Sequence, residues 1–338
     1  MNHLSLQHNN DQKKSHKNFF IFSAENNYDL GEKMGARFRI ECQASVSESS
    51  KHPYWIQKKE IAQSRIALHM EQFPQYITEL QGYASGAHVD FLDLFTLSLE
   101  DEVDSALGEH CTSIIAGQGS LIGHNEDWDE SSANDICIVQ KTIQDTTILE
   151  LYYYNTLGGN ACSINSYGYI SMVNSLPFQH TSPGISKNFL ARFLSETNNP
   201  ATDSKKITRI PKMSAYSVTL ARSPIEIFNI EFDATRTTKR KITPPFVHTN
   251  HFLFRDNPPL PDEVSTTFDR FAVAQENISV IRSMHELETL TETSAGNSSD
   301  ILNVRTLARV LVHIENKKVH IWLRRENERG FITYPLPF

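Results

Sequence analysis

The order of helical and strand-like patterns along the chain predicts an α+β fold built from layers of sheets and helices. Residues 1–110 carry mainly helical patterns, the middle of the chain carries many short strand-like runs, and helical patterns return toward the C-terminal end. Strands that follow one another in a block usually pair as antiparallel sheets, which helices then cover. The 338 residues, of which 39% are hydrophobic, suffice for one large domain with a substantial core.

Composition and charge argue against several classes of protein. The net charge is −8 and the basic runs are short, so the chain offers no basic surface for a nucleic acid. No run approaches the roughly 18 apolar residues of a membrane span. Residues 1–18 are polar, lack the apolar core of a signal peptide, and are expected to form a disordered tail before a single domain over residues 19–338. These features predict a cytoplasmic protein that acts on small molecules.

The helical part of the chain contains recognisable starts and breaks. A helix that leads into a loop or strand is expected over Asp29–Cys42, and loosely helical spacing over residues 53–80 is interrupted at Pro74. A further helix is expected over Gln75–Tyr83. The next helix has Asp90 as its expected N-cap, because a carboxylate there can accept the first free backbone N–H groups.

The pattern changes to strands at residue 110. The segment HCTSIIAGQGSLIGHNEDWD, which begins with His110, is typical of a β-hairpin with Gly117 and Gly119 at its tip. A hairpin of this length brings its start and its end side by side. We therefore expect Asp127 or Asn125 to neighbour Cys111.

Further strands and helices are expected after this hairpin. Helical patterns occupy Lys187–Ser195, residues 267–284 and residues 299–311. The expected strands are Ile136–Lys141, Thr147–Tyr154, Ala161–Asn165, Tyr169–Asn174, Ser217–Ala221, Glu226–Asp233 and Val319–Leu323.

The four cysteines do not form a recognisable metal or disulfide pattern. None belongs to a Cys-x-x-Cys pair, and their scatter argues against a disulfide scaffold. Three of them are expected to be small buried core residues. Cys111 differs, because it opens a predicted strand directly after a helical segment and faces a carboxylate across the hairpin. Such a carboxylate can hold an α-ammonium group or a substrate cation.

Five signatures occur in a fixed order along the chain: ELQGYASGAHVDFLDLF, HCTSII with GHNEDWD, GYISMVNSL, VHTNHF and STTFDRFAVA. Together they resemble the acyl-coenzyme A:isopenicillin N acyltransferase family of N-terminal-nucleophile (Ntn) hydrolases, to which carcinine and β-alanyl-dopamine hydrolases are related. The resemblance implies a four-layer αββα sandwich of the Ntn-hydrolase type. It also implies self-cleavage between His110 and Cys111, giving fragments 1–110 and 111–338 that stay associated.

The chemistry of this cleavage has a physical basis. A thiol placed against the preceding carbonyl, that of His110, can attack it in an N-to-S acyl shift. Hydrolysis of the resulting ester leaves Cys111 with a free α-amino group. An α-amine has a pKa of roughly 7.7–8.0 and can therefore take the proton of its own thiol. The resemblance assigns Asp127 to contact with this new amino terminus.

Three more residues receive roles from the resemblance. Asn250 corresponds to the side-chain donor to the oxyanion, Asn174 to a second asparagine near the site, and Arg270 to an arginine that holds the nucleophile's surroundings. Each has a structural alternative. Asn250 suits a turn or a helix cap, Asn174 suits hydrogen bonding at a strand end, and Arg270 suits a surface ion pair with Asp269.

The leading functional prediction is hydrolysis of a linear amide of a small molecule through a thioester at Cys111, without a cofactor or metal. Acyl transfer, in which an amine resolves the thioester, stays open because the exclusion of water depends on the shape of the pocket. An uncleaved binding protein is the alternative of another class. Intact Cys111, Asp127 and Asn250 argue against it.

A metal-dependent hydrolase is disfavoured. Its candidate ligands, His124, Glu126, Asp127 and Asp129, alternate along one predicted strand and are expected to face opposite sides. His124 and His248 are also expected to be structural, because a free α-amine makes a histidine base unnecessary.

Overall fold

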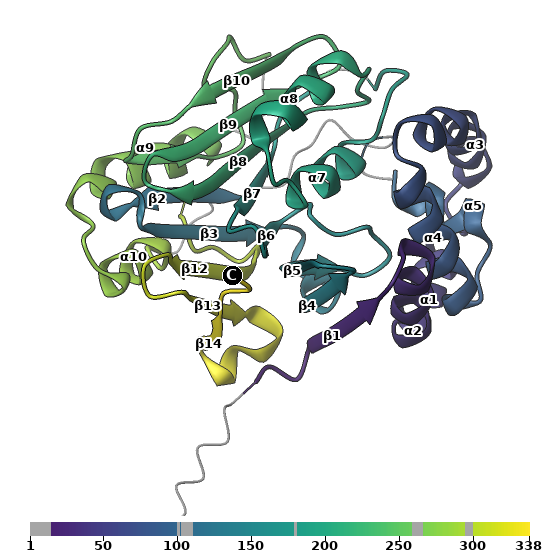
Figure 1. The fold of residues 1–338 in the computed structure, drawn as a ribbon, viewed down its shortest axis with the longest axis horizontal. Helices are drawn as coiled ribbons and strands as arrows, with labels where there is room; N and C mark the ends of the chain where they lie inside the picture. Colours follow the sequence, from purple (N-terminus) through teal and green to yellow (C-terminus); the bar gives the residue numbers. More distant parts are fainter. Residues whose placement is uncertain (1–14, 100–101, 103–110, 179–180, 259–265, 295–299) are drawn as a thin grey trace, which may run out of the picture.

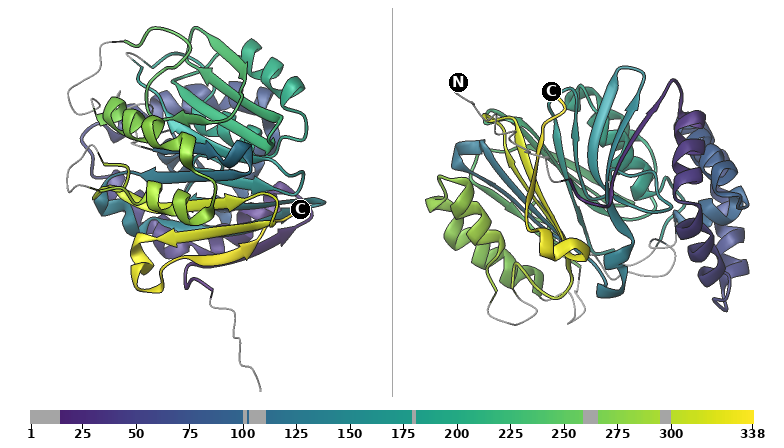
Figure 2. Two further views of the ribbon diagram at one scale, coloured as in Figure 1. Left: turned by 90° about the vertical axis from the view of Figure 1, so that its left-hand side faces the viewer. Right: turned by 90° about the horizontal axis from the view of Figure 1, so that it is seen from below.

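Two β-sheets pack face to face and helices cover both outer faces, which gives four layers (Figure 2). This arrangement confirms the predicted α+β class and the αββα sandwich. The structure is a computed structural model, and it describes residues 15–99, 102, 111–178, 181–258, 266–294 and 300–338. In the described residues, no helix has the length and apolar character needed to cross a lipid bilayer.

The larger sheet has eight strands in the order β1-β4-β5-β6-β7-β8-β9-β10. Its neighbours are antiparallel except for β1, which lies parallel to β4. The strands are β1 (Phe19–Ala24), β4 (Ile136–Ile143), β5 (Thr146–Tyr153), β6 (Cys162–Asn165), β7 (Ile170–Ser175), β8 (Tyr216–Ser223), β9 (Glu226–Phe232) and β10 (Thr237–Lys241).

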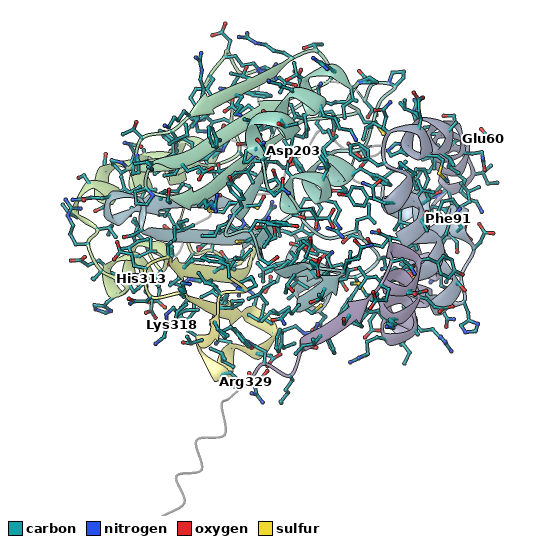
Figure 3. The ribbon with its side chains drawn as sticks, viewed as in Figure 1. Glu60, Phe91, Asp203, His313, Lys318 and Arg329 are labelled. Atoms are coloured by element: carbon teal, nitrogen blue, oxygen red, sulfur yellow. The ribbon has the colours of Figure 1, made fainter. Side chains whose placement is uncertain are left out.

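The smaller sheet has six antiparallel strands in the order β11-β2-β3-β12-β13-β14. The turn between β12 and β13 lies at the surface, where His313 pairs with Lys318 (Figure 3). The strands are β2 (Thr112–Ala116), β3 (Leu121–Asp127), β11 (Phe246–His248), β12 (Thr306–His313), β13 (Lys318–Leu323) and β14 (Ile332–Pro335).

The helices divide between the two outer layers (Figure 1). Those beside the larger sheet are α1 (Asn27–Arg37), α2 (Arg39–Ser49), α3 (Trp55–Gln72), α4 (Pro74–Ala87), α5 (Phe91–Leu97), α7 (Lys187–Ser195) and α8 (Pro200–Arg209). Those beside the smaller sheet are α9 (Thr266–Asn277) and α10 (Met284–Thr291).

The apolar core follows the same layers. Leu80 of α4 and Tyr152 of β5 belong to the core between the larger sheet and its helices. Ile138 of β4 and Val310 of β12 belong to the core between the two sheets. Leu287 of α10 belongs to the core beneath the smaller sheet. Because each sheet is covered on both faces, central strands such as β3 and β7 are buried along their whole length.

Several predicted elements differ from the structure. The helix predicted over residues 299–311 is wrong, because β12 runs through the middle of the smaller sheet between β3 and β13. A strand buried on both faces presents a nearly continuous apolar run, which periodicity cannot distinguish from a helix. The loop or strand predicted at the end of Asp29–Cys42 is wrong, because α1 ends at Arg37 and a second helix, α2, begins at Arg39. By contrast, the break at Pro74 and the N-cap at Asp90 are confirmed.

The chain before β1 contacts the C-terminal part of the domain. Residues 1–14 of the predicted tail lie outside the described residues. His16 is buried, and its Nδ1 lies 2.7 Å from the hydroxyl of Tyr334. The backbone N–H groups of the next two residues donate to the carboxylate of Glu326, each at 2.8 Å. The described chain is therefore anchored from residue 16 onward.

Candidate active site

The hairpin of β2 and β3 places a carboxylate beside the sulfur of Cys111. Thr112 pairs with Asn125 in the antiparallel register, so Cys111, one residue earlier, lies opposite Glu126. The Cys111 thiol donates to Oε2 of Glu126, with 3.4 Å between Sγ and the oxygen. Asn125 and Asp127, the residues expected to neighbour Cys111, flank Glu126 on β3, and their side chains point to the opposite face, so the group at the sulfur itself is Glu126.

The backbone carbonyl of Cys111 is held by two long-range hydrogen bonds. Nη1 of Arg270, on α9, donates to it at 2.9 Å, and Nδ2 of Asn174, on β7, donates at 3.1 Å. Nη2 of Arg270 also donates to Oδ1 of Asn250 at 2.9 Å. Four predicted site residues therefore form one network. Arg270 is fully buried, so the alternative of a surface ion pair with Asp269 is wrong.

Both asparagines also join separate segments of the chain. Nδ2 of Asn250 donates to the carbonyl of Ser175 at 3.0 Å, and its backbone N–H donates to Oγ1 of Thr267 at 2.7 Å. Nδ2 of Asn174 also lies 3.4 Å from the carbonyl oxygen of His248. These contacts fasten the loop after β11 to the end of β7 and to α9.

Asp127 is buried on the other face of β3. Its Oδ2 accepts a hydrogen bond from Asn303 at 3.3 Å, whereas Oδ1 has no partner among the described residues. Burial raises the pKa of Asp127 to about 6, and the positive charge of Arg270 opposes that rise. His110, the residue expected opposite Asp127, lies outside the described residues.

A second network extends from Glu126 into the space between the sheets. Tyr153 donates to Oε1 of Glu126 at 2.8 Å, and Nε2 of His124 lies 2.9 Å from Oε2. Nδ1 of His124 lies 3.0 Å from Oγ of Ser113, which donates to Oδ1 of Asn174 at 2.8 Å. The two networks therefore meet at Asn174.

Burial changes the pKa of both Glu126 and His124. It raises the pKa of Glu126 to about 8, while the hydrogen bonds from Tyr153 and Cys111 act in the opposite direction. It lowers the pKa of His124 to about 4, because a buried imidazolium is costly. The sequence offered a signal for this cluster: His124 and Glu126 are two apart on a strand and must share a face.

The four candidate ligands of a metal site do not all lie together, as expected from their alternation along the strand. His124 and Glu126 share a face of β3, but Asp127 lies on the other face and Asp129 caps the short 3₁₀ helix that follows. Ligand atoms of Cys111, His124 and Glu126 do lie within 4.8 Å of one another. Direct hydrogen bonds between these groups account for that spacing, so we describe them as a hydrogen-bonded cluster.

A cavity of about 490 Å³ adjoins the cluster. Tyr153 lines it and also donates to Glu126, so one side chain joins the cavity to the carboxylate at the sulfur. Trp128, Asn160 and Asn188 contribute further walls. Cys111 itself is fully buried. The arrangement thus combines a shielded thiol with a nearby space of small-molecule size.

Comparisons with known proteins identify the family of the chain. Residues 115–328, more than half of the chain, match the model of the family described as acyl-coenzyme A:6-aminopenicillanic acid acyl-transferase. A β-alanyl-dopamine/carcinine hydrolase from Drosophila melanogaster is 28% identical over 152 residues, a match that spans 38% of this chain and 39% of that relative.

Two solved structures show a more distant likeness. A mutant of conjugated bile acid hydrolase from Clostridium perfringens aligns at 10% identity with a TM-score of 0.43, covering 67% of this chain and 92% of that one. Penicillin V acylase from Agrobacterium tumefaciens aligns at 11% identity with a TM-score of 0.39, covering 63% and 83%.

Proposed function

Because the chain belongs to the acyl-coenzyme A:6-aminopenicillanic acid acyl-transferase family, we propose that it is a self-processing amidohydrolase. In this proposal Cys111 is the nucleophile and cleaves a linear amide through a thioester. The family membership confirms the resemblance that the sequence signatures predict. The observation that carries the proposal is the network around Cys111, where Arg270 and Asn174 hold the carbonyl and Glu126 meets the sulfur.

Self-cleavage would begin with attack of the thiol on the carbonyl of His110. The S–C bond forms, the C–N bond breaks and the nitrogen of Cys111 takes a proton, which leaves a thioester between the two fragments. Water then hydrolyses the thioester and regenerates the thiol. The two hydrogen bonds to the Cys111 carbonyl support this step, because they fix the backbone on one side of the bond to be cleaved.

Turnover would use the amino group that cleavage releases. The amine takes the thiol proton, and the thiolate attacks the substrate amide to form a tetrahedral intermediate. Nδ2 of Asn250 carries two hydrogens, and the contact with Ser175 uses one of them. The other is available to the oxyanion. Oδ1 of Asp127, which has no partner among the described residues, is available to accept from the new amine.

The two fragments would stay associated after cleavage. Side chains of α1 and α4, before residue 111, share one core with β5 and β8, which follow it. Strand β1 also pairs with β4 over its whole length. Separating the fragments would expose this core, and its apolar burial opposes that at about 25 cal/mol per Å².

Acyl transfer is the second candidate activity, and the family description favours it. It differs from hydrolysis only in the last step, where an amine attacks the thioester in place of water. Adding a series of amines to a hydrolysis assay separates the two, since transfer produces a new amide and hydrolysis only the free acid.

We propose that the cavity beside Tyr153 and Trp128 receives the substrate. A cytoplasmic location stays a prediction.

Substitution of cysteines tests the nucleophile. Cys111→Ala should give an uncleaved, inactive chain, because neither the acyl shift nor the thioester can form. Cys162→Ala is the matched control, since Cys162 is also buried, but burial raises its thiol pKa well above the usual range. Cleavage and activity should persist in that control. Equal losses in the two variants, with folding intact, would contradict the assignment of Cys111.

A further inference from the structure

Self-cleavage needs a proton acceptor before the α-amino group exists. In the uncleaved chain the nitrogen of Cys111 belongs to a peptide bond, and an amide nitrogen cannot take the thiol proton. We propose that Glu126 accepts this proton while His124 takes the one that Glu126 already holds. This relay rests on the self-processing proposed above and assigns it a base distinct from the amine used in turnover.

Hydrogen-bond accounting fixes the tautomer of His124. Nδ2 of Asn174 faces the carbonyl oxygens of Cys111 and His248, so Oδ1 is the atom that faces Ser113. An amide oxygen only accepts, and the single hydroxyl hydrogen of Ser113 therefore points to Asn174. The Ser113 oxygen must then accept from Nδ1 of His124, which carries a hydrogen.

This tautomer requires a proton between the imidazole and the carboxyl group. With its hydrogen on Nδ1, a neutral His124 presents a lone pair at Nε2, only 2.9 Å from Oε2 of Glu126. Two lone pairs at that distance repel, so one proton must lie between them. Because burial lowers the pKa of His124 and raises that of Glu126, the resting position of the proton is on the carboxyl group.

The same carboxyl oxygen accepts a hydrogen bond from the thiol of Cys111, with 3.4 Å between Oε2 and Sγ. In the relay, the S–H bond breaks as an O–H bond forms at Oε2, and the proton already on Oε2 moves to Nε2 of His124. The products are a thiolate, a neutral carboxylic acid and an imidazolium. No proton is gained or lost overall, and the thiolate and imidazolium charges arise together as a pair.

Other charged and titratable groups surround the relay. Tyr153 of β5 donates to the second oxygen of Glu126, and Cys162 of β6 is close enough to interact with it electrostatically. On the other face of β3 lie Asp127 and, from α9, the positive charge of Arg270. Arg270 favours a thiolate at Cys111, since it also interacts electrostatically with that sulfur.

The chain contains a matched control for the relay. Glu231 and His248 form a second buried pair, with 3.1 Å between Oε1 and Nε2. Glu231 accepts hydrogen bonds from the backbone N–H groups of Leu253 and Phe254. Glu126 instead accepts a hydrogen bond from the thiol of Cys111. The substitutions Glu126→Gln and Glu231→Gln therefore remove the same group from the same kind of pair, and only the first removes the proton acceptor at the sulfur.

The experiment follows self-cleavage of full-length chains made by cell-free synthesis. Translation is stopped, the chains are diluted into buffers from about pH 6 to about pH 9.5, and samples denatured at intervals are resolved by mass. Glu126→Gln should slow cleavage by about 10² or more, as expected for loss of a general base. Glu231→Gln should stay within about threefold of wild type, far below that factor. Raising the pH should rescue Glu126→Gln by about tenfold per unit, because hydroxide replaces the missing base.

The outcomes separate the relay from the proposed function. If the wild-type chain cleaves itself and Glu126→Gln cleaves equally fast, the relay is overturned and the proposed function stands. If the wild-type chain never cleaves, the relay and the proposed function are both overturned. Slow cleavage that high pH does not rescue would indicate a structural defect and also overturn the relay. If circular dichroism shows Glu126→Gln to be unfolded, His124→Gln tests the same relay, because glutamine keeps a hydrogen-bonding group but cannot take the proton. A wild-type rate in His124→Gln would overturn it.

Discussion

The described residues include two buried histidine–glutamate pairs, one in β3 and one between β11 and β9. His124–Glu126 has 2.9 Å between nitrogen and oxygen, and His248–Glu231 has 3.1 Å. In both pairs Nδ1 lies against an oxygen, that of Ser113 in the first and the backbone carbonyl of Thr249 in the second. The pairs are alike in chemistry and in burial.

The two pairs differ in the other groups that the carboxylate contacts. Glu126 meets the sulfur of Cys111 and the hydroxyl of Tyr153, whereas Glu231 receives two backbone N–H groups from the loop after β11. That loop also carries Asn250. We conclude that burial and pairing alone do not identify a catalytic group. The contact with a nucleophile distinguishes the first pair, and the contact with a loop gives the second a structural role.

The largest expected effect concerns Asn250, which stands on the loop held by the second pair. Asn250→Ala should lower kcat by about 10²–10³, because a donor to the oxyanion is lost in the tetrahedral state. Asn257→Ala is the matched control: among the described residues, the Asn257 side chain bonds only the backbone of Phe252 in the same loop. It should lower the melting temperature with little change in kcat. Similar kcat values in the two variants would remove Asn250 from the oxyanion site.

Substituting glutamine for the histidine of each pair tests the two roles separately. His124→Gln should slow self-cleavage by about 10², since the relay loses its final acceptor. His248→Gln should instead lower the melting temperature, because glutamine cannot reproduce the contacts of the imidazole with both the Thr249 carbonyl and Glu231, and a buried group left without its partner typically costs about 1–3 kcal/mol. Cleavage rates and melting curves on the same preparations separate the two roles. A slower cleavage in His248→Gln than in His124→Gln would reverse the assignment.

A smaller effect is expected from Tyr153→Phe. The Tyr153 hydroxyl lowers the pKa of Glu126, which burial has raised to about 8, so its removal should raise that pKa further. Because the relay starts from protonated Glu126, the pH at which the rate of self-cleavage falls to half its maximum should then move upward in Tyr153→Phe relative to wild type. Tyr154→Phe, on the adjacent residue, is the control. An unchanged or lower midpoint in Tyr153→Phe would argue against Glu126 as the titrating group.

The smallest expected effect is on stability. The folded-state pKa of Glu126 lies above the ordinary value of 4.5, so its contribution to stability is fully present below about pH 4.5 and is lost as pH rises through about 8. Glu126→Gln lacks this titration. The melting temperature of the uncleaved Cys111→Ala chain should therefore fall more between pH 5 and pH 8 than that of the double variant with Glu126→Gln. Parallel curves would contradict a raised pKa.

The sequence predicted the local elements of the site well. Gly117 and Gly119 indicated the hairpin tip, and both adopt positive φ angles there. The amphipathic pattern of Lys187–Ser195 predicted α7 with its observed bounds. These features depend on neighbouring residues, so a single sequence contains the relevant information.

Other features depended on residues far apart in the chain. Asn174 and Arg270 meet at the carbonyl of Cys111 across 63 and 159 residues, and only the family resemblance indicated that they share a site. Which carboxylate contacts the sulfur depends on register, and a shift of one residue exchanges Glu126 for Asp127, so the sequence indicated the neighbourhood of Cys111 but not this contact. Strand β12 was misread as helical because both of its faces are buried.

Self-cleavage before Cys111 is the step on which the proposed function depends, and the mass of the purified wild-type protein under denaturing conditions shows whether it occurs. Active enzyme should consist of two polypeptides, residues 1–110 and 111–338, and amino-terminal sequencing of the second should begin Cys-Thr-Ser. Cys111→Ala, prepared in parallel, should give one chain of 338 residues. A single full-length wild-type chain that hydrolyses amides or transfers acyl groups would rule out self-cleavage as the route to activity.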